Sequence, residues 1–495
     1  MQELLTNILS LIFLFLSSLL LLIILSFKRR ESGSGFINTL SVISLIIGLF
    51  WESYRIYSSG GEYLGHMITV NNLTSISTII LYITGIFSII ITDSFRGFLT
   101  EDRGDSAILT LFGLCGMQLM IISSEFILML IGLEIASMSL FVLSARNHRS
   151  RLAIEGTIKY LIFSSVFFAI SLLGVALLYG YMLSVGLTSD MLSFHNLGFA
   201  GRSINAGNVL FIIMYIFIVA LILLKLGIVP FHMWMPDFYE GSASCVSGFA
   251  STSIKVASTI LLVNIFSKLF FMPLVADYHI AFKFLELLTI ITIIVATVIA
   301  LHQTNAKRLI AYSSIANAAI IMLGILSFTV MQKEMRGAIL SNVLFFLLIY
   351  SIMNLLAFGI ISRLEKAGGE NQLLTNFSGL YYKSPFLAIA LSVALFSLAG
   401  LPPTGGFFAK LFIFKSAIDS GLIQTSVIAI LMTIISLYYY LNFVVIMFLK
   451  EPVGEKRYEG SISFNISTSL MLFILIITGF FPNILTNLIS ELIGK

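Results

Sequence analysis

The sequence predicts an all-α membrane protein with about fourteen transmembrane helices, two of them broken. Of its 495 residues, 58% are hydrophobic and 11% are charged, whereas soluble proteins carry about 25% charged residues. The apolar residues fall in runs of about 17 to 25, the length that crosses a bilayer as a helix. Two runs have a lysine with proline close by in the chain, which lipid penalises unless the helix break faces protein or a water-filled cavity.

The spans follow one another with short polar connections, so no large soluble domain is expected. Each begins and ends where an apolar run does. In order, we expect them at Ile8–Phe27, Phe36–Trp51, Leu73–Ile91, Ala107–Ile122, Phe126–Ser144, Gly156–Tyr181, Asn208–Val229, Ser244–Leu269, Phe284–Leu301, Leu309–Phe328, Gly337–Ile361, Pro385–Ala417, Thr425–Leu449 and Phe464–Leu485.

The loops after odd-numbered spans hold most of the basic residues. The positive-inside rule therefore places these loops in the cytoplasm or matrix and both termini on the opposite side. The net charge of +4 indicates no nucleic-acid partner. The basic residues after odd spans are Lys28, Arg29, Arg30, Arg96, Arg103, Arg146, Arg149, Arg151, Lys307, Arg308, Arg363, Lys366, Lys383, Lys450, Lys456 and Arg457.

The two broken spans share a short pattern. LGIVPF at Leu226–Phe231 resembles AGLPPT at Ala399–Thr404, and each has a lysine nearby, Lys225 and Lys410. Interrupted segments in two halves of a membrane protein indicate a transport site. The two segments are five spans apart, an odd offset, so the repeats that contain them would be inverted.

Four ionisable residues lie well inside apolar runs: Glu134, Lys225, Lys255 and Lys410. Lys159 lies about one turn inside the sixth span. Such residues are rare in spans because desolvation penalises their charged form. They are candidates for a proton path, since burial moves the pKa of a lysine readily whereas arginine stays charged. Structural ion pairs, or side chains that extend to the interface, are the alternative interpretation.

In the proton-path interpretation, a Glu134–Lys225 ion pair holds Lys225 protonated, and its separation releases a proton toward Lys255. Two interpretations of His232 stay open. It either relays protons near neutral pH or hydrogen-bonds the carbonyls freed by Pro230.

Several binding motifs are missing from the sequence. It has no Walker loop, no GxGxxG before a helix, no cysteine cluster and no pair of histidines within spans. Cys115 and Cys245 fit no metal spacing. We therefore expect the chain to bind no metal, nucleotide, iron–sulfur cluster or haem, and to run no redox chemistry alone.

The segments that carry these candidates resemble the antiporter-like membrane subunits of respiratory complex I, NADH:quinone oxidoreductase. The stretches PFHMWMPDFYEG and KRLIAYSSI are the most specific. The first three spans match mainly by hydropathy. The resembling segments are LIGLEIASMSLFVLSA (Leu130–Ala145), IEGTIKYLIFSS (Ile154–Ser165), KLGIVPFHMWMPDFYEGS (Lys225–Ser242), SIKVAS (Ser253–Ser258), QTNAKRLIAYSSIAN (Gln303–Asn317) and AGLPPTGGFFAKLFIF (Ala399–Phe414).

The resemblance implies a fourteen-helix bundle with two inverted five-helix repeats and broken helices 7 and 12. It divides the chain into an N-terminal three-helix region (1–104), a first repeat (105–270, broken near 225–236), a second repeat (283–450, broken near 400–406) and a C-terminal helix (451–495). Glu134, Lys159, Lys225, Lys255 and Lys410 match lysines and a glutamate of the family's proton path. Asn317 stands where the family often has histidine, so a titratable relay is lost or replaced there.

By this resemblance, the expected function is proton translocation coupled to electron transfer from NADH to quinone. NADH, flavin, iron–sulfur clusters and quinone would be bound by other subunits of the complex. The expected partners are other membrane-arm subunits and the lipid bilayer, with cardiolipin as a candidate lipid. The expected location is the mitochondrial inner membrane, with both termini in the intermembrane space, or else a bacterial plasma membrane. The alternatives are a subunit of a multisubunit cation/proton antiporter and a non-conducting scaffold subunit of the membrane arm.

Overall fold

The protein is built almost entirely of helices, with one short hairpin. The computed structural model describes residues 2–27, 30–56, 60–64, 66–95, 102–146, 150–184, 186, 190–196, 209–269, 276–365, 372–452 and 461–494. Its helices are α1 (Gln2–Phe27), α2 (Arg30–Arg55), α3 (Asn72–Ser94), α4 (Asp102–Ile122), α5 (Phe126–Ala145), α6 (Arg151–Ser184), α8 (Val209–Leu226), α9 (Trp234–Gly241), α10 (Ser244–Leu269), α11 (Ala276–Leu301), α12 (Ala306–Val330), α13 (Arg336–Leu364), α14 (Leu380–Lys383), α15 (Pro385–Ala399), α16 (Gly405–Asp419), α17 (Ile423–Leu449), α18 (Ile462–Phe480) and α19 (Pro482–Gly494).

Within the described residues, twelve helices are long and apolar enough to span a membrane. Two shorter apolar helices, Ile213–Leu226 and Pro385–Ala399, are the first halves of the two broken spans. Together they account for the expected fourteen spans, and the predicted fold class is confirmed. Polar caps set several helix starts: Asn71 accepts from Thr74 N in a capping box, and Asn305 caps α12.

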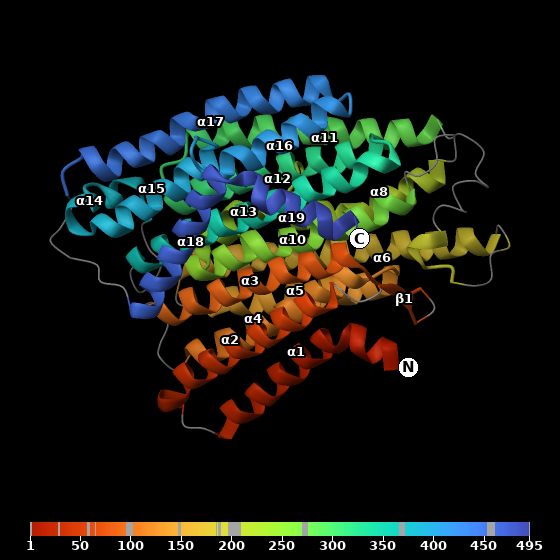
Figure 1. Ribbon diagram of the computed structural model, residues 1–495, viewed down its shortest axis with the longest axis horizontal. Helices are drawn as coiled ribbons and strands as arrows, with labels where there is room; N and C mark the ends of the chain where they lie inside the picture. Colours follow the sequence, from red (N-terminus) through yellow and green to blue (C-terminus); the bar gives the residue numbers. More distant parts are fainter. Residues whose placement is uncertain are drawn as a thin grey trace.

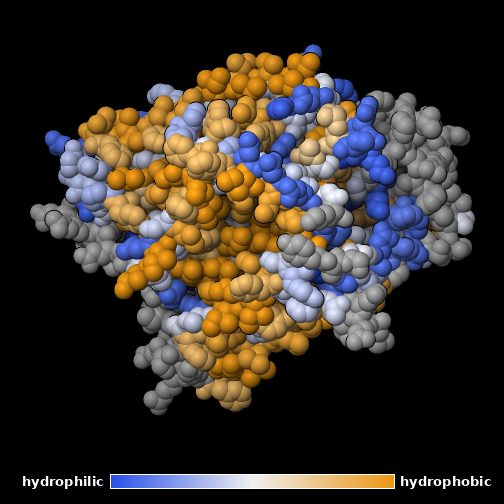
Figure 2. All heavy atoms as spheres, in the orientation of Figure 1, coloured by the Kyte–Doolittle hydropathy of each residue, from blue (hydrophilic) through white to orange (hydrophobic). Residues whose placement is uncertain are grey.

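The helices lie side by side along the long axis of the view in Figure 1, with α1 and α2 at the lower edge and α17 and α11 at the upper edge. Between them lie α10, α12 and α13, whose spans are almost wholly buried. Apolar residues dominate the middle of the face in Figure 2, and hydrophilic ones gather toward the sides where helices end. This distribution suits a chain whose outer helices face lipid or other membrane proteins.

Both predicted helix breaks are present and have the same backbone design. Gly227 and Gly400 each follow the first half-helix with φ of +81°. The backbone N–H groups of Gly227 and Ile228 donate to Leu223 O, and those of Gly400 and Leu401 donate to Phe396 O. A positive φ with these paired bonds is the Schellman ending, which glycine favours because it has no Cβ. Each break thus ends one helix without leaving all of its last carbonyls unpaired.

The structure departs from the predicted elements in a few places. The described part of 52–72 contains the last turn of α2 and a hairpin of β1 (Gly61–Tyr63) and β2 (Ile68–Val70), where a loop was expected. The last span ends at Phe480, and α19 then packs against α13 and α3. Two short 3-10 helices, η1 (Lys333–Met335) and η2 (Leu374–Phe377), also lie in connections. Hydropathy missed these elements because they are short or amphipathic.

The assignment of basic residues to loops was partly wrong. Lys307 is fully buried and Arg363 is 8% exposed, because α12 starts at Ala306 and α13 continues to Leu364. The charge rule counts residues near span ends and does not detect buried partners. Lys307 pairs with Glu365, and Arg363 donates to Ser94 O. Several of the other counted residues lie outside the residues whose side chains the structure describes: Lys28, Arg29, Arg30, Arg96, Arg103, Arg149, Lys366, Lys456 and Arg457.

Replacing Gly156 by alanine is expected to destabilise the fold by roughly 1–3 kcal/mol or more, since overpacking forces backbone shifts. A Cβ at Gly156 on α6 would collide with the Asp237 carbonyl oxygen on α9. On the same helix, a Cβ at Gly180 would meet nothing within 4 Å, so Gly180→Ala should be neutral or stabilising by up to ~1 kcal/mol. Thermal unfolding of the two purified variants measures the difference, and equal midpoints would contradict the close α6–α9 contact.

Candidate functional site

Lys255 lies at the centre of the bundle. It projects from α10 between α12 and α13 and is fully buried. Its ammonium donates to Ser314 O and Ser314 Oγ, at 2.5 and 2.6 Å, and to the Tyr350 hydroxyl at 3.2 Å. Tyr350 in turn donates to Ser251 O. The charge is therefore held by neutral oxygens from two helices, α12 and α13.

Lys225 occupies the last turn of α8, directly before the first break. It is 1% exposed and donates to Ser164 Oγ at 2.8 Å and to Tyr160 Oη at 3.1 Å, both on α6. Its ammonium also lies 4.6 Å from the centroid of the Tyr160 ring. A cation at this position is favoured by the partial negative charge of the helix C-terminus.

Lys410 reaches the equivalent place at the second break from the opposite side. It lies on α16, after the break, and its ammonium donates back to Leu398 O in the last turn of α15 at 2.6 Å. It is 5% exposed. Both break lysines therefore sit at the C-terminal end of a first half-helix, and neither faces lipid.

Glu134 does not pair with Lys225. It lies on α5 and lines an open groove of about 720 Å³ together with residues of α4 and α6. Among the described residues it has neither a hydrogen bond nor an ion pair, and α6 packs between α5 and α8. The expected pair is therefore wrong for the isolated chain, because helix order cannot show which face of α5 carries the carboxylate. The remaining lining residues are Leu109, Phe112, Ile127, Leu130, Ile131, Ile135, Met138, Ser139, Val142, Phe168 and Leu172.

Lys159 and His232 lie beside the first break. Lys159 is 39% exposed and forms ion pairs with Glu155 at 2.5 Å and Asp237 at 2.6 Å. His232 is 8% exposed, and its buried Nδ1 has no partner among the described residues. The Leu224 carbonyl accepts from Gly227 N and from the Trp234 indole N–H, each at 3.1 Å. The sequence did not reveal this hydrogen bond of Trp234.

A charge cluster at one end of the bundle links α9, which follows the first helix break, to α12, and links α12 to the end of α13. Arg308, at the start of α12, contacts Asp237 Oδ1 and Glu240 Oε2 of α9, each at 2.7 Å. Next to it, Lys307 pairs with Glu365 at 2.8 Å, and both side chains are at most 1% exposed. Sequence reasoning had placed these basic residues in a loop. One signal could have found the pair: Lys307 lies at the start of α12, and the oppositely charged Glu365 lies at the end of α13.

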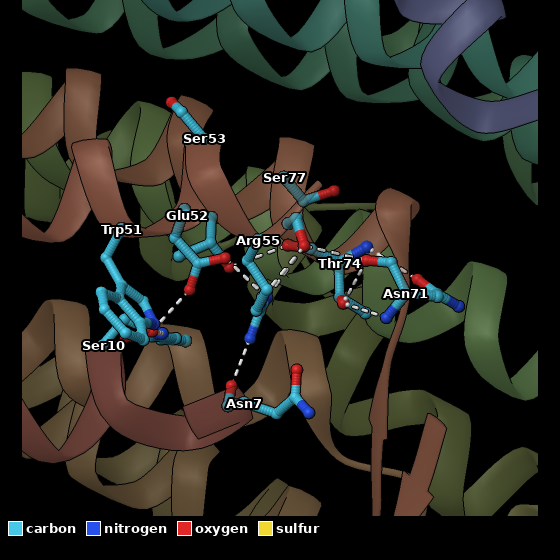
Figure 3. A network of polar contacts seen from close by, with 12 residues as sticks. Asn7, Ser10, Trp51, Glu52, Ser53, Arg55, Asn71, Thr74 and Ser77 are labelled. Atoms are coloured by element: carbon cyan, nitrogen blue, oxygen red, sulfur yellow. Dashed lines mark hydrogen bonds and ion pairs between the residues drawn. The ribbon is translucent and has the colours of Figure 1, made fainter. Parts of the chain in front are cut away.

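A second buried network holds the N-terminal helices together (Figure 3). Glu52 and Arg55 of α2 pair at 2.6 Å and are 0% and 5% exposed. Ser10 of α1 donates to Glu52, and Arg55 donates to the carbonyl of Asn7. Arg55 also bonds Ser75 Oγ of α3. The pair therefore links α1 and α3 through α2, a structural role that the sequence did not reveal.

No group of three or more His, Cys, Asp or Glu side chains that could hold a metal ion occurs within the described ranges. The site is instead a set of three buried lysines with hydroxyl and carbonyl partners. Such a set suits the movement of protons, because hydroxyl groups accept hydrogen bonds from an ammonium and donate to a neutral amine.

Comparison with known proteins identifies the family to which the chain belongs. Residues 123–436 match the family described as "NADH:quinone oxidoreductase/Mrp antiporter, TM". The chain belongs to this family of multi-pass antiporter-like membrane subunits.

The particular relatives are named NADH-quinone oxidoreductase subunit N. The "subunit N 1" protein of Roseiflexus castenholzii is 33% identical over 79% of this chain and 74% of its own length. That of Thioalkalivibrio sulfidiphilus is also 33% identical, over 79% and 78%. This agrees with the expected resemblance to the antiporter-like membrane subunits of complex I.

Solved structures share the fold. A chain of respiratory complex I from Thermus thermophilus has a TM-score of 0.79 at 24% identity, covering 97% of this chain and 98% of that chain. A chain of the Mrp complex from Dietzia sp. DQ12-45-1b reaches 0.82 at 15% identity, covering 99% and 97%. At these identities the likeness establishes the fold alone.

Proposed function

We propose that the chain is a proton-translocating core subunit of the membrane arm of NADH:quinone oxidoreductase. The observation that carries this is the set Lys225, Lys255 and Lys410, which are buried at the two breaks and in the innermost helices. In the part of the chain that the structure describes, none of the three forms an ion pair. An ammonium held by neutral oxygens alone has no fixed countercharge to keep it protonated.

The partners of Lys225 and Lys255 allow both protonation states. Ser164, Tyr160, Ser314 and Tyr350 offer hydroxyls, each of which is an acceptor for the ammonium and, after rotation, a donor to the neutral amine. A proton can therefore leave and return without stranding a buried polar group. This chemistry is what a proton path across the membrane arm needs.

The driving step would come from outside this chain. NADH, flavin, iron–sulfur clusters and quinone are assigned to other subunits, and quinone reduction there would change the charge near the lysines. Glu134, in its open apolar groove, is where a neighbouring membrane subunit would pack. We propose that its carboxylate acts across that contact, with Lys159 and His232 in secondary positions beside the break.

The relatives named above are bacterial, which favours a plasma membrane over the mitochondrial inner membrane. We further propose that both termini lie outside and that the chain divides into 1–104, two inverted repeats over 105–270 and 283–450, and 451–495. The two identically built breaks support the repeat division.

Replacing Lys225 by methionine in the assembled complex is expected to lower proton pumping per NADH and to slow NADH:quinone turnover by ~10²-fold or more, the range that a positioned proton-transfer group contributes. The measurement is dye-monitored acidification of vesicles together with NADH oxidation. Lys333→Met removes an exposed lysine from η1 and serves as the control. Normal pumping and turnover in an assembled Lys225→Met complex would rule out the proposed role and leave a scaffold subunit.

A further inference from the structure

Two consecutive serines on α12 face different neighbours. Side chains of adjacent helical residues project roughly 100° apart. Ser314 Oγ accepts from Lys255 at 2.6 Å, whereas Ser313 Oγ hydrogen-bonds the hydroxyl of Tyr440 on α17. Ser313 and Ser314 are fully buried, and Tyr440 is 1% exposed. The residue next to Ser314 thus forms a second buried hydroxyl contact, which links α12 to α17.

Asn317 lies one turn further along α12 and adds an independent observation. It is 2% exposed, and its Nδ2 donates to Ser313 O at 2.9 Å. It also lies beside the Tyr440 hydroxyl. Its Oδ1 is buried with no hydrogen-bond partner among the described residues. A buried amide oxygen left unpaired is destabilising, so this atom marks a place that a small hydrogen-bond donor such as water would occupy.

We propose that Tyr440, with Ser313 and Asn317, forms a hydroxyl relay that carries protons between Lys255 and Lys410. This inference rests on the proposed proton-translocating function and names further residues for it. It assigns this step to uncharged side chains of α12 and α17 rather than to a titratable group.

The proton balance closes with water as the only added reactant. The Lys255 ammonium releases one proton through a water molecule to Ser313 Oγ, and Ser313 passes its own hydroxyl proton to Tyr440 Oη. Tyr440 passes its former hydroxyl proton to a second water, held by Asn317 Oδ1, which delivers it toward Lys410. Each hydroxyl gains one proton and loses one, no bond between heavy atoms changes, and rotation of the hydroxyls restores the starting arrangement.

A purely structural role would look different. If the Ser313–Tyr440 bond only fastens α17 to α12, removing the hydroxyls would lower stability and leave proton transfer unchanged. Tyr440→Phe keeps the ring that packs against Tyr439 at 4.4 Å between centroids. It therefore removes the proposed relay atom while leaving most of the packing in place.

The experiment compares assembled complexes that carry Tyr440→Phe, Ser313→Ala or both with two matched controls. Tyr82→Phe removes another buried tyrosine hydroxyl, which donates to Gln118 in the N-terminal region. Ser327→Ala removes a buried hydroxyl of α12 that bonds only its own helix, at Leu323 O. We expect the relay variants to lose proton pumping by ~10-fold or more, below the ~10²-fold that a positioned acid–base group often contributes, and the controls to stay near the parent.

Two further measurements separate relay from packing. The solvent deuterium isotope effect on NADH:quinone turnover is expected to rise in Tyr440→Phe and not in Tyr82→Phe. Asn317→His, which adds a titratable group beside the missing hydroxyl, is expected to restore part of the pumping in the Tyr440→Phe background.

The outcomes distinguish this inference from the proposed function. If Lys255→Met abolishes pumping while Tyr440→Phe and Ser313→Ala match their controls, the relay is overturned and the lysine path stands. If Lys255→Met itself pumps normally, the proposed function is overturned and the relay with it. A third outcome concerns assembly. If Tyr440→Phe fails to assemble and Asn317→His does not repair this, the isotope effect of Ser313→Ala decides. An unchanged isotope effect in that variant also overturns the relay.

Discussion

Lys255→Met is expected to abolish proton pumping by this subunit and to slow NADH:quinone turnover by about 10²-fold, the scale of a lost proton-transfer group. Methionine retains much of the length and apolar volume of lysine, so the interior of α10, α12 and α13 stays packed. What disappears is the one amine that meets Ser314 and Tyr350 at the centre of the bundle. Proton pumping into vesicles and NADH oxidation measure the effect.

Lys255→Arg tests whether position 255 must release a proton or only carry a positive charge. Arginine keeps a positive charge at this position but does not release its proton in proteins. It is therefore expected to fail in pumping as methionine does, provided that the complex assembles. Lys268→Met, on the same helix but 38% exposed, is the control. Pumping retained by Lys255→Arg would show that the position needs only a cation, and proton release from Lys255 would be disproved.

Lys307→Met is expected to destabilise the protein by roughly 3–5 kcal/mol, the usual cost of stranding one member of a buried ion pair. Lys307 and Glu365 are at most 1% exposed. Lys307 also donates to Ser242 O, and Glu365 accepts from Ser244 N. The pair therefore fixes the α9–α10 turn of the first half to α12 and α13 of the second. The measurement is the temperature at which the purified complex loses this subunit.

Two further variants test whether the loss of stability in Lys307→Met comes from the stranded charge. In Lys307→Met with Glu365→Gln, no charge is stranded and the acceptor for Ser244 N remains, so most of the stability should return. Lys283→Met breaks the ion pair with Glu286. Lys283 is 70% exposed and Glu286 keeps its hydrogen bond from Thr425, so this change should cost less than Lys307→Met. Equal stability of Lys307→Met and Lys283→Met would mean that the fully buried pair contributes no more than a pair with an exposed lysine.

Hydropathy and a few lysines inside apolar runs were enough to predict most of the fold. The fourteen spans, both breaks and the burial of Lys225, Lys255 and Lys410 follow from the fact that hydrocarbon tolerates neither unpaired backbone groups nor exposed ammonium groups. The similar Gly and Pro spacing in LGIVPF and AGLPPT predicted two similar breaks, and Gly227 and Gly400 have the same φ. The roles of these residues in proton transfer stay predictions.

The contacts between side chains could not be derived in the same way. Glu134 and Lys225 were expected to pair because both are buried charges of one repeat, yet α6 lies between their helices. Likewise, Lys307 and Arg363 looked like loop residues. Which side of a helix faces which neighbour depends on the rotation of each helix about its axis. That rotation is set by packing against all neighbours together, and the low charge content offers few markers for it.

The sequence by itself thus determined that the chain crosses a membrane many times and carries ammonium groups inside it, because transfer of polar groups into lipid is governed by local composition. Only the tertiary structure decided that Glu134 faces outward into a groove, that Lys307 meets Glu365, and that Tyr440 meets Ser313. These contacts join residues from 58 to 127 positions apart, and close packing of the whole bundle, rather than any local pattern, brings them together.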